Sequence, residues 1–293
     1  MNKFTSKHPG FEHLRKKWTA RHKETTDNLL DKHARHIAAT SLGSLMLLST
    51  PGLSVATPPS ELQPTHETTI GASSSNNALL ASELVDKLPK EIDKLTDDQD
   101  QAIIGLIKKD LGIDVKAEID NKRLNRTYGV IGGEQHLYRY PGDALQNHAR
   151  DAQDWAMYGG SGIAPGLGAY GYFAPSREAM TPEIEMRERY YLAVQTFLSP
   201  GFSERVAEYR DFYRFRKMLV INPKTGQAVV AVIGDAGPAE WTKKHLGGSP
   251  EVMHELGLAG GPRKGPVLYY FVDDPENKVP LGPINLTVEG GST

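Results

Sequence analysis

The residue whose type and position most clearly point to chemistry is Asp235. It follows an almost wholly apolar run, residues 228–233, and is flanked by Gly234 and by Ala236-Gly237-Pro238. Glycines on either side allow another backbone to come close. Burial among apolar groups keeps a carboxylic acid protonated near neutral pH, which a general acid requires. We therefore expect Asp235 either to be held by backbone N–H groups or to act as an acid.

The elements that position Asp235 are predicted to be the two strands of a β-hairpin. Met218–Ile221 is a short apolar run, and Pro223-Lys224-Thr225-Gly226 has the composition of a turn. The second strand, Gln227–Ile233, is rich in Val and Ile. Because this strand is apolar at nearly every position, we expect both of its faces to be buried.

A resemblance becomes visible when the residues after the hairpin are included. The order is hairpin, Val-rich strand, Gly234-Asp235-Ala236-Gly237-Pro238, then Leu246-Gly247-Gly248-Ser249 and a short helix before Leu256-Gly257-Leu258. This order resembles the core of double-psi β-barrels. Its G-D-x-G-P segment is similar to those of family 75 chitosanases and of rare lipoprotein A-like lytic transglycosylases; expansins share the barrel. The resemblance implies that Asp235 is a catalytic acid.

Two positions depart from the patterns of these families. The chitosanases have a Glu where this chain has Gly248, and the lipoprotein A-like enzymes have an upstream His where this chain has a residue near Tyr209. Asp235 therefore lacks the usual second catalytic group at its expected place.

A replacement for that group is expected in the glycine- and aromatic-rich region that begins near Tyr128. Glu134 and His136 are two residues apart and would share one face of a strand. Asp143 follows in a predicted turn. We take Glu134 as the leading candidate and Asp143 as the next, and the alternative for each is a side chain that caps a turn.

Sugar contacts are assigned to residues that can stack on or hydrogen-bond to a pyranose. These candidates are Trp241, Tyr170, Tyr172, His136 and His245. The alternative for the tyrosines is a place in the β core or at its rim.

We expect the run Trp155–Phe173 to be a first barrel strand with a glycine-rich entrance. Gly166–Gly171 formally matches a dinucleotide-binding fingerprint, but no apolar strand precedes it and no helix follows.

Other chemistries have little support in the sequence. The chain has no cysteine, so disulfides and thiolate sites are excluded. Neither H-E-x-x-H nor G-x-S-x-G occurs. We therefore predict no metal site and no cofactor. A net charge of −2 gives no global field that would favour nucleic acid as a partner.

The chain divides by composition into five segments. Residues 1–56 combine a basic region, a short apolar core and small residues, as in a secretory signal peptide or a signal anchor. Residues 57–78 are expected to be a flexible linker, and residues 79–124 a helical segment with helices at Leu79–Leu88 and Thr96–Gly112. Residues 125–285 form the predicted barrel domain, and 286–293 a tail. Helices are also predicted at Thr181–Leu198 and Phe202–Arg216, and a last strand at Pro266–Val272.

Together these patterns predict a mainly β protein with added helices (α+β), built on a six-stranded double-psi β-barrel. The expected role is that of a secreted or cell-envelope protein that cleaves glycosidic bonds in a cell-wall polysaccharide such as peptidoglycan or a chitosan-like polymer. It would contact the membrane only through its N-terminal signal or anchor. The alternatives are an expansin-like polysaccharide-binding module without catalysis and an envelope protein-interaction domain.

Overall fold

The computed structural model describes residues 68–284. The predicted signal segment, residues 1–56, and the predicted tail, residues 286–293, lie outside this range. Within residues 68–284 no helix has the length and apolar character needed to cross a bilayer.

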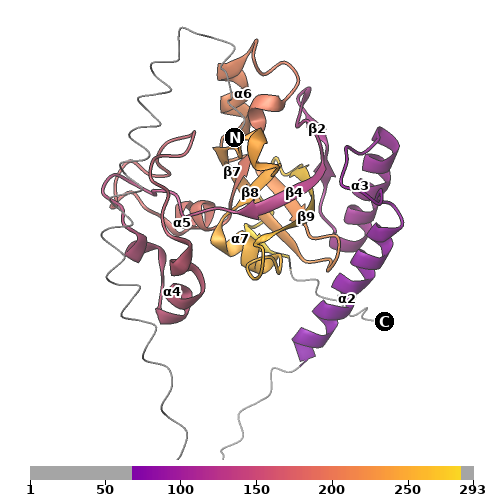
Figure 1. Cartoon of the computed structure of the whole chain (residues 1–293), viewed down its shortest axis with the longest axis horizontal. Coiled ribbons are helices and arrows are strands. Elements are labelled where there is room, and N and C mark those ends of the chain that lie inside the picture. Colours follow the sequence, from indigo (N-terminus) through magenta and orange to yellow (C-terminus); the bar gives the residue numbers. More distant parts are fainter. Residues whose placement is uncertain (1–67, 285–293) are drawn as a thin grey trace, which may run out of the picture. The chain divides into compact units, whose positions relative to one another are not determined.

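The centre of the fold is a closed barrel of six strands, in which parallel and antiparallel pairs are mixed (Figure 1). Around the ring, β4 pairs with β8, β8 with β5, β5 with β7, β7 with β6, β6 with β9, and β9 with β4. The pairs β4·β8 and β5·β7 are parallel and the other four are antiparallel. The predicted α+β fold with a six-stranded barrel is confirmed. The strands are β4 (Tyr128–Gly133), β5 (Tyr191–Val194), β6 (Lys217–Ile221), β7 (Ala228–Ala236), β8 (Leu246–Gly248) and β9 (Lys264–Val272).

The interior of the barrel is filled by alternate residues of the strands, as the two-residue period of a β-strand requires. On β7, Val229, Ala231 and Ile233 belong to the interior cluster, whereas Val230 packs outside the ring. Ala228–Gly234 are all buried. The predictions of a hairpin and of a strand buried on both faces are confirmed, and the predicted last strand is β9.

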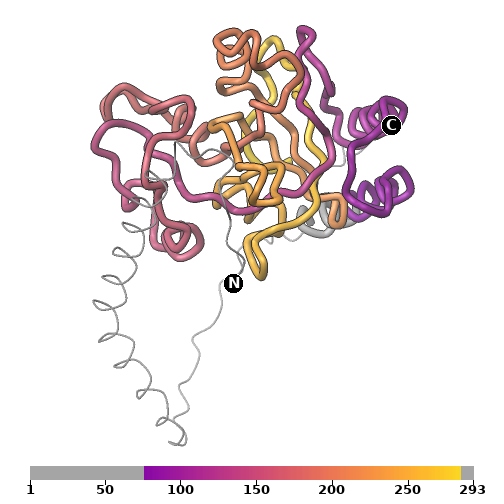
Figure 2. The backbone as a smooth tube through the Cα atoms, turned by 45° about the horizontal axis from the view of Figure 1, so that its top comes forward, coloured from indigo at the N-terminus to yellow at the C-terminus, as the bar shows by residue number. Residues whose placement is uncertain are grey.

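One outer face of the barrel is covered by the helices α2 (Thr68–Val85) and α3 (Asp97–Leu111) (Figures 1 and 2). Helix α3 begins after the predicted capping box: Thr96 accepts a hydrogen bond from the Gln99 amide, and the Gln99 side chain bonds back to Thr96. Gly112, in the left-handed conformation, ends it. Because α2 begins at Thr68, the linker prediction is wrong for residues 68–78.

Another part of the outer surface is covered by residues 134–189, which we call the cover segment (rose in Figures 1 and 2). It contains the helices α4 (Ala152–Tyr158) and α5 (Pro182–Arg189) and the 3-10 turns η2 (Leu145–His148) and η3 (Gly159–Ser161). The prediction of a barrel strand at Trp155–Phe173 is wrong, because this run forms α4, η3 and turns.

The predicted helix at Thr181–Leu198 is correct only in its first half. Thr181 caps α5 and Pro182 occupies its first turn, but α5 ends at Arg189 and Tyr191–Val194 form strand β5. The apolar run Tyr-Leu-Ala-Val lies between β7 and β8, where both of its backbone edges find partners. Tertiary pairing therefore overrides the helical pattern.

Short elements complete the described chain. Helix α6 confirms the centre of the helix predicted at Phe202–Arg216, and two terminal strands extend the sheet beyond the barrel. These elements are α6 (Val206–Tyr213), α7 (Pro250–Glu255), η4 (Thr196–Leu198), η5 (Glu240–Thr242), β1 (Val115–Lys116), β10 (Gly282–Pro283) and the hairpin β2–β3 (Glu118–Ile119, Lys122–Arg123).

The contact between α3 and the barrel depends on one buried carboxylate, which yields a first prediction. Asp100 is 2% exposed and accepts hydrogen bonds from Thr127 Oγ1 at 2.5 Å and from Tyr270 Oη at 2.8 Å. Replacing Tyr270 with Phe removes a donor to a charged acceptor, and we expect a loss of about 1.5–3 kcal/mol in the free energy of unfolding. Urea denaturation of Tyr270→Phe measures this loss.

The matched control is Tyr269→Phe, one residue earlier on β9. The Tyr269 hydroxyl forms no hydrogen bond with any residue from 68 to 284. If both variants lose the same stability, the loss comes from repacking of the aromatic ring and the hydrogen bond to Asp100 is not its cause.

Candidate functional site

Asp235 lies at the end of β7, where an irregularity in the pairing turns its side chain outward. Leu192 pairs with Ile233, but the next residue of β5, Ala193, pairs with Asp235, so Gly234 is an extra residue in β7. Asp235 Oδ1 accepts hydrogen bonds from the backbone N–H groups of Ala169, at 2.6 Å, and Ala236, at 2.8 Å. Both bonds go to the same oxygen.

Two opposing influences act on the proton of Asp235. Burial disfavours its charged form, and the N–H groups of Ala169 and Ala236 favour it. Burial prevails and raises the pKa of Asp235 above its usual value. The side chain is half-buried, so it retains contact with the surroundings. This combination is suited to a proton donor.

Glu134 lies on the same outer face of the sheet as Asp235, two strands away. Asp235 pairs with Ala193, and Ala193 pairs with Gly247. The Glu134 side chain covers Gly247 so closely that a Cβ atom there would overlap its carboxylate. Two strand spacings, about 10 Å, therefore separate the backbone positions beneath the two acids. Between these two positions the sheet carries only the small residue Ala193.

Glu134 is fixed by two contacts with strand β8 and the residues just before it. Its backbone N–H donates to Gly248 O at 2.9 Å, and Lys244 Nζ lies 2.7 Å from its Oε1. A Cβ at Gly132 would overlap the Lys244 side chain, so a larger residue there would displace Lys244 from its present position. The side chain is thus held as a paired carboxylate above Gly247.

Gln195 joins the two loops that flank Asp235. Its side chain is buried, and its Nε2 donates to Pro238 O at 2.9 Å and to Lys244 O at 3.1 Å. A single amide therefore connects the Asp235 loop to the segment that carries the partner of Glu134. No local sequence pattern indicates this role, because the bonds run to backbone atoms more than forty residues away.

His136 and Asp143, both predicted at the site, lie instead in a buried group within the cover segment. We call His136, Arg139, Asp143, His148 and Glu188 the polar cluster. Each of these residues is at most 7% exposed. His148 Nε2 lies 2.9 Å from Asp143 Oδ2 and its Nδ1 lies 3.1 Å from Glu188 Oε2. Arg139 Nε donates to Glu188 Oε2 at 2.8 Å.

The charges of the polar cluster balance one another. Burial opposes ionisation of Asp143, but its hydrogen bonds with His148, Arg139 N and Asn147 prevail and lower its pKa to about 2. Burial also opposes protonation of His148, but its bonds to Asp143 and Glu188 prevail and raise its pKa to about 9. Glu188 likewise stays ionised: despite its burial, His136, His148 and Arg139 lower its pKa. Asp143 is therefore committed to His148 and is not free to assist Asp235.

The same cluster holds the described side chains that can ligate a metal ion. His136, His148 and Glu188 each offer one ligand atom, and these atoms lie within 4.8 Å of one another. Neither His148 nor Glu188 was singled out in the sequence, because forty residues separate them and each resembles an ordinary surface polar residue. Of the three residues, only His136 is a candidate site residue in the sequence analysis.

Glu251 is a second acid that the sequence did not identify. On the short helix α7 it is 0% exposed, whereas His254 on the same helix is exposed. Neither carboxylate oxygen of Glu251 has a hydrogen-bond partner, and the nearest cation, Arg189 Nη1, is 3.6 Å from Oε1. Burial, together with the charge of Glu188, raises the pKa of Glu251 to about 7.

The predicted sugar-contact residues occupy different positions around the barrel. Tyr170 is half-buried near Asp235; burial and, less strongly, the Asp235 charge raise its pKa to about 12. Tyr172 is also half-buried, and Trp241, on η5, is 85% exposed. His245 Nδ1 accepts a hydrogen bond from Val130 N at 2.9 Å, and burial, with Arg126 and Lys264, lowers its pKa to about 4. His245 is therefore a neutral structural acceptor.

The two positions at which the sequence departs from the families it resembles supply no catalytic group. Tyr209 is 1% exposed and its hydroxyl donates to Pro200 O. Gly248 lies within β8, and a Cβ there would be 3.0 Å from Ile131 Cδ1. A Glu at position 248 would have to displace core side chains. The second catalytic carboxylate of the chitosanases therefore does not fit at this position unless the core repacks.

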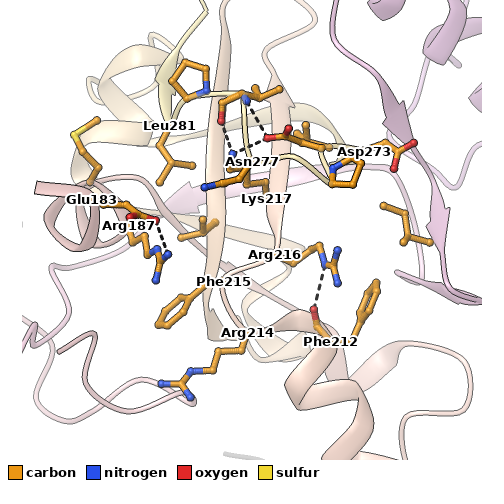
Figure 3. Close-up of a pocket in the computed structure, with 18 of the residues that line it drawn as sticks. Glu183, Arg187, Phe212, Arg214, Phe215, Arg216, Lys217, Asp273, Asn277 and Leu281 are labelled. Carbon is orange, nitrogen blue, oxygen red and sulfur yellow. Dashed lines mark hydrogen bonds and ion pairs between the residues drawn. The ribbon is translucent and has the colours of Figure 1, made fainter. Parts of the chain in front are cut away.

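A pocket of about 660 Å³ lies elsewhere on the molecule, near Phe215 (Figure 3). Its rim carries Arg187 and Arg214, whose guanidinium carbons are 5.4 Å and 5.1 Å from the centre of the Phe215 ring. Lys217 and Asp274 form an ion pair at 2.7 Å in its wall. None of the residues predicted for the site lines this pocket. Its walls carry both charge signs, so its shape alone assigns no ligand.

Comparisons with known proteins name no relative: no family model, no curated protein and no solved structure matches this chain.

The buried Glu251 gives a second prediction. Because its folded pKa of about 7 lies above the ordinary value of 4.5 for a glutamate, wild-type stability falls as pH rises from about 4.5 through 7. Gln at this position cannot ionise, so the stability of Glu251→Gln relative to wild type should rise between pH 5 and pH 8, by on the order of 2–3 kcal/mol. Urea denaturation at both pH values measures it.

Glu255→Gln, on the same helix and half-buried, serves as the control. It should show no such dependence on pH. A stability difference for Glu251→Gln that is equal at pH 5 and pH 8 would mean that Glu251 ionises at the same pH in the folded and unfolded chains.

Proposed function

We propose that this protein is an exported double-psi β-barrel enzyme that cleaves glycosidic bonds in a cell-wall polysaccharide. In this proposal residues 1–56 direct export. The ring of six strands, with its two parallel pairs β4·β8 and β5·β7, supports the barrel assignment. The G-D-x-G-P segment at the end of a central strand supports the relation to chitosanase-like and lipoprotein A-like enzymes.

The observation that carries the proposal is the arrangement of Asp235 and Glu134. Their side chains lie on one face of the sheet with Ala193 between them. Asp235 and Gly247, the residue that Glu134 covers, are two strand spacings, about 10 Å, apart. Carboxyl groups about 6.5–9.5 Å apart are typical of inverting glycosidases, in which a water molecule enters between them. Asp235, whose pKa is raised by burial, acts as the general acid on the leaving oxygen. Glu134, paired with Lys244, acts as the base that activates water.

The same acid can serve a lytic route. There a hydroxyl of the substrate attacks, so that Asp235 alone protonates the leaving group and no water enters. The proposal therefore makes Asp235 necessary in both routes, and Glu134 necessary in the hydrolytic route.

An expansin-like binding function is the second candidate, and one observation favours it. Trp241 projects from η5 with 85% of its surface exposed, next to the Asp235 loop in the chain. An exposed indole is a platform on which a sugar ring can stack. In this reading Asp235 fixes the loop through its bonds to Ala169 and Ala236 and takes no part in chemistry.

A third prediction tests catalysis. The full-length protein is incubated with peptidoglycan, chitosan and chitin, and soluble products are identified by mass spectrometry. Asp235→Asn keeps the acceptor for both N–H bonds but cannot give a proton, so product release should fall about 100-fold or more. Because the active form carries the proton, wild-type activity should also decline as pH rises through the pKa of Asp235.

Glu134→Gln separates the two routes: it should slow hydrolysis to a similar degree but leave products with anhydro ends unaffected. Glu240→Gln, an exposed carboxylate on η5, is the control and should be fully active. If Asp235→Asn releases the same products at the same rate as wild type, Asp235 is not the acid.

A fourth prediction tests the binding function. Trp241→Ala should weaken co-sedimentation with the preferred polymer by about 5- to 100-fold, a loss typical of one stacking aromatic residue. Co-sedimentation that requires Trp241 but not Asp235, without released products, would establish the binding module. Absence of both products and co-sedimentation would leave the protein-interaction alternative.

A further inference from the structure

The polar cluster contains a buried nitrogen that the protein leaves without a hydrogen bond. His136 is 1% exposed, and its Nδ1 has no hydrogen-bond partner. Glu188 Oε1 lies 3.4 Å away. Such orphaned groups are rare because desolvation of a polar atom without compensation costs about 1–3 kcal/mol. The His136 ring also lies beside the His148 ring, with the two ring centroids 4.7 Å apart.

The spacing of the ligand atoms fits an ion placed between them. His136 Nδ1 is 3.4 Å from Glu188 Oε1, and His148 Nδ1 is 3.1 Å from Glu188 Oε2. Nitrogen and oxygen ligands lie about 2.0–2.2 Å from zinc, so neighbouring ligands of a tetrahedral ion are about 3.3–3.6 Å apart. The two observed separations, one to each oxygen of Glu188, are close to this edge length, and one ligand atom from each of the three residues lies within 4.8 Å of the other two.

The orientation of His148 supports the same conclusion. Its Nε2 lies 2.9 Å from Asp143 Oδ2, and Asp143 is fixed in turn by the N–H groups of Arg139 and Ala144 and by Asn147. Histidine ligands usually donate their second ring nitrogen to a carboxylate in this way. With the proton on Nε2, the lone pair of His148 Nδ1 points toward Glu188.

Charge also favours a cation. The cluster holds two carboxylates and one guanidinium, so with both imidazoles neutral, as metal ligands must be, a net charge of −1 is left for a cation to offset. The adjoining pair of Arg189 and Asp154 is neutral in sum. Arg139 donates to Glu188 Oε2, whereas Oε1 accepts from Leu137 N at 3.1 Å and also faces His136.

We propose that His136, His148 and Glu188 bind a divalent transition-metal ion, with zinc the best match to two imidazoles and one carboxylate. When the ion binds, it replaces the proton that lies between His148 Nδ1 and Glu188 Oε2, and that proton passes to solvent. It joins η2 and α5 to the strand-like segment at His136, which forms a bridge with Ile163. This site stabilises the cover segment and is independent of the glycosidic reaction proposed for Asp235.

Metal content of the full-length protein tests the site. The chain is stripped with EDTA, desalted, given zinc or cobalt(II), desalted again and analysed by mass spectrometry of the elements. Wild type should retain one ion per chain and unfold at a higher temperature than the stripped protein. Cobalt(II) should give the strong visible absorption of a four-coordinate site. In protein labelled at histidine with ¹⁵N, zinc should shift the ring signals of His136 and His148, a readout that needs no variant.

Variants separate this site from the six histidines that precede Thr68. His136→Gln and Glu188→Gln should lose the ion and the thermal shift, whereas His254→Gln, exposed on α7, should keep both. The proposal is overturned if wild type retains no ion, or if zinc leaves the His136 and His148 signals unchanged. It is also overturned if folded His136→Gln retains as much metal as wild type.

Discussion

One buried carboxylate, Glu188, ties the first part of the cover segment to α5, the helix that leads into barrel strand β5. It is 0% exposed and lies at the end of α5, directly before the turn into β5. Leu137 N, Arg139 Nε and His148 Nδ1 all lie within 3.1 Å of its oxygens. Removing a partner from a buried ion pair typically costs about 3–5 kcal/mol, since the remaining charge has no solvent. Residues 136–148 therefore have one low-energy position relative to β5.

The position of Asp235 follows from that contact through a short chain of neighbours. His136 pairs with Ile163, which sets the path of the backbone toward Gly168 and Ala169. Ala169 then donates to Asp235, and Gly168 packs so closely that a Cβ would be 3.2 Å from Asp235 Cγ. The acid is thus positioned from two directions: by strand β7 from below and by the cover segment from above. A barrel without this segment would leave Asp235 exposed, with the pKa of an ordinary surface carboxyl.

The sequence predicts those parts of this arrangement that depend on local patterns. The hairpin of β6 and β7, the capping box at Thr96 and the place of Asp235 at a strand end all follow from composition within ten to fifteen residues. The polar cluster does not, because its members are brought together only when β4 and β5 enter the barrel on either side of β8. Glu188 occurs in a run of charged residues that looks like the exposed side of a helix. The same tertiary pairing converts Tyr191–Val194 from predicted helix to strand.

The extra residue in β7 explains why the acid and the apolar strand can coexist. In regular pairing, the residue after Gly234 would point into the barrel, where Ile233 and Leu192 already fill the space. Gly234 is the extra residue that shifts the pairing. A larger residue would not fit there, because its Cβ would lie 2.8 Å from the Tyr191 side chain. Asp235 is therefore turned to the outer face beside Ala193. A substitution at Gly234 would therefore displace Asp235 by moving the strand, without any direct contact with the carboxyl group. Gly234 is thus a positioning residue for Asp235.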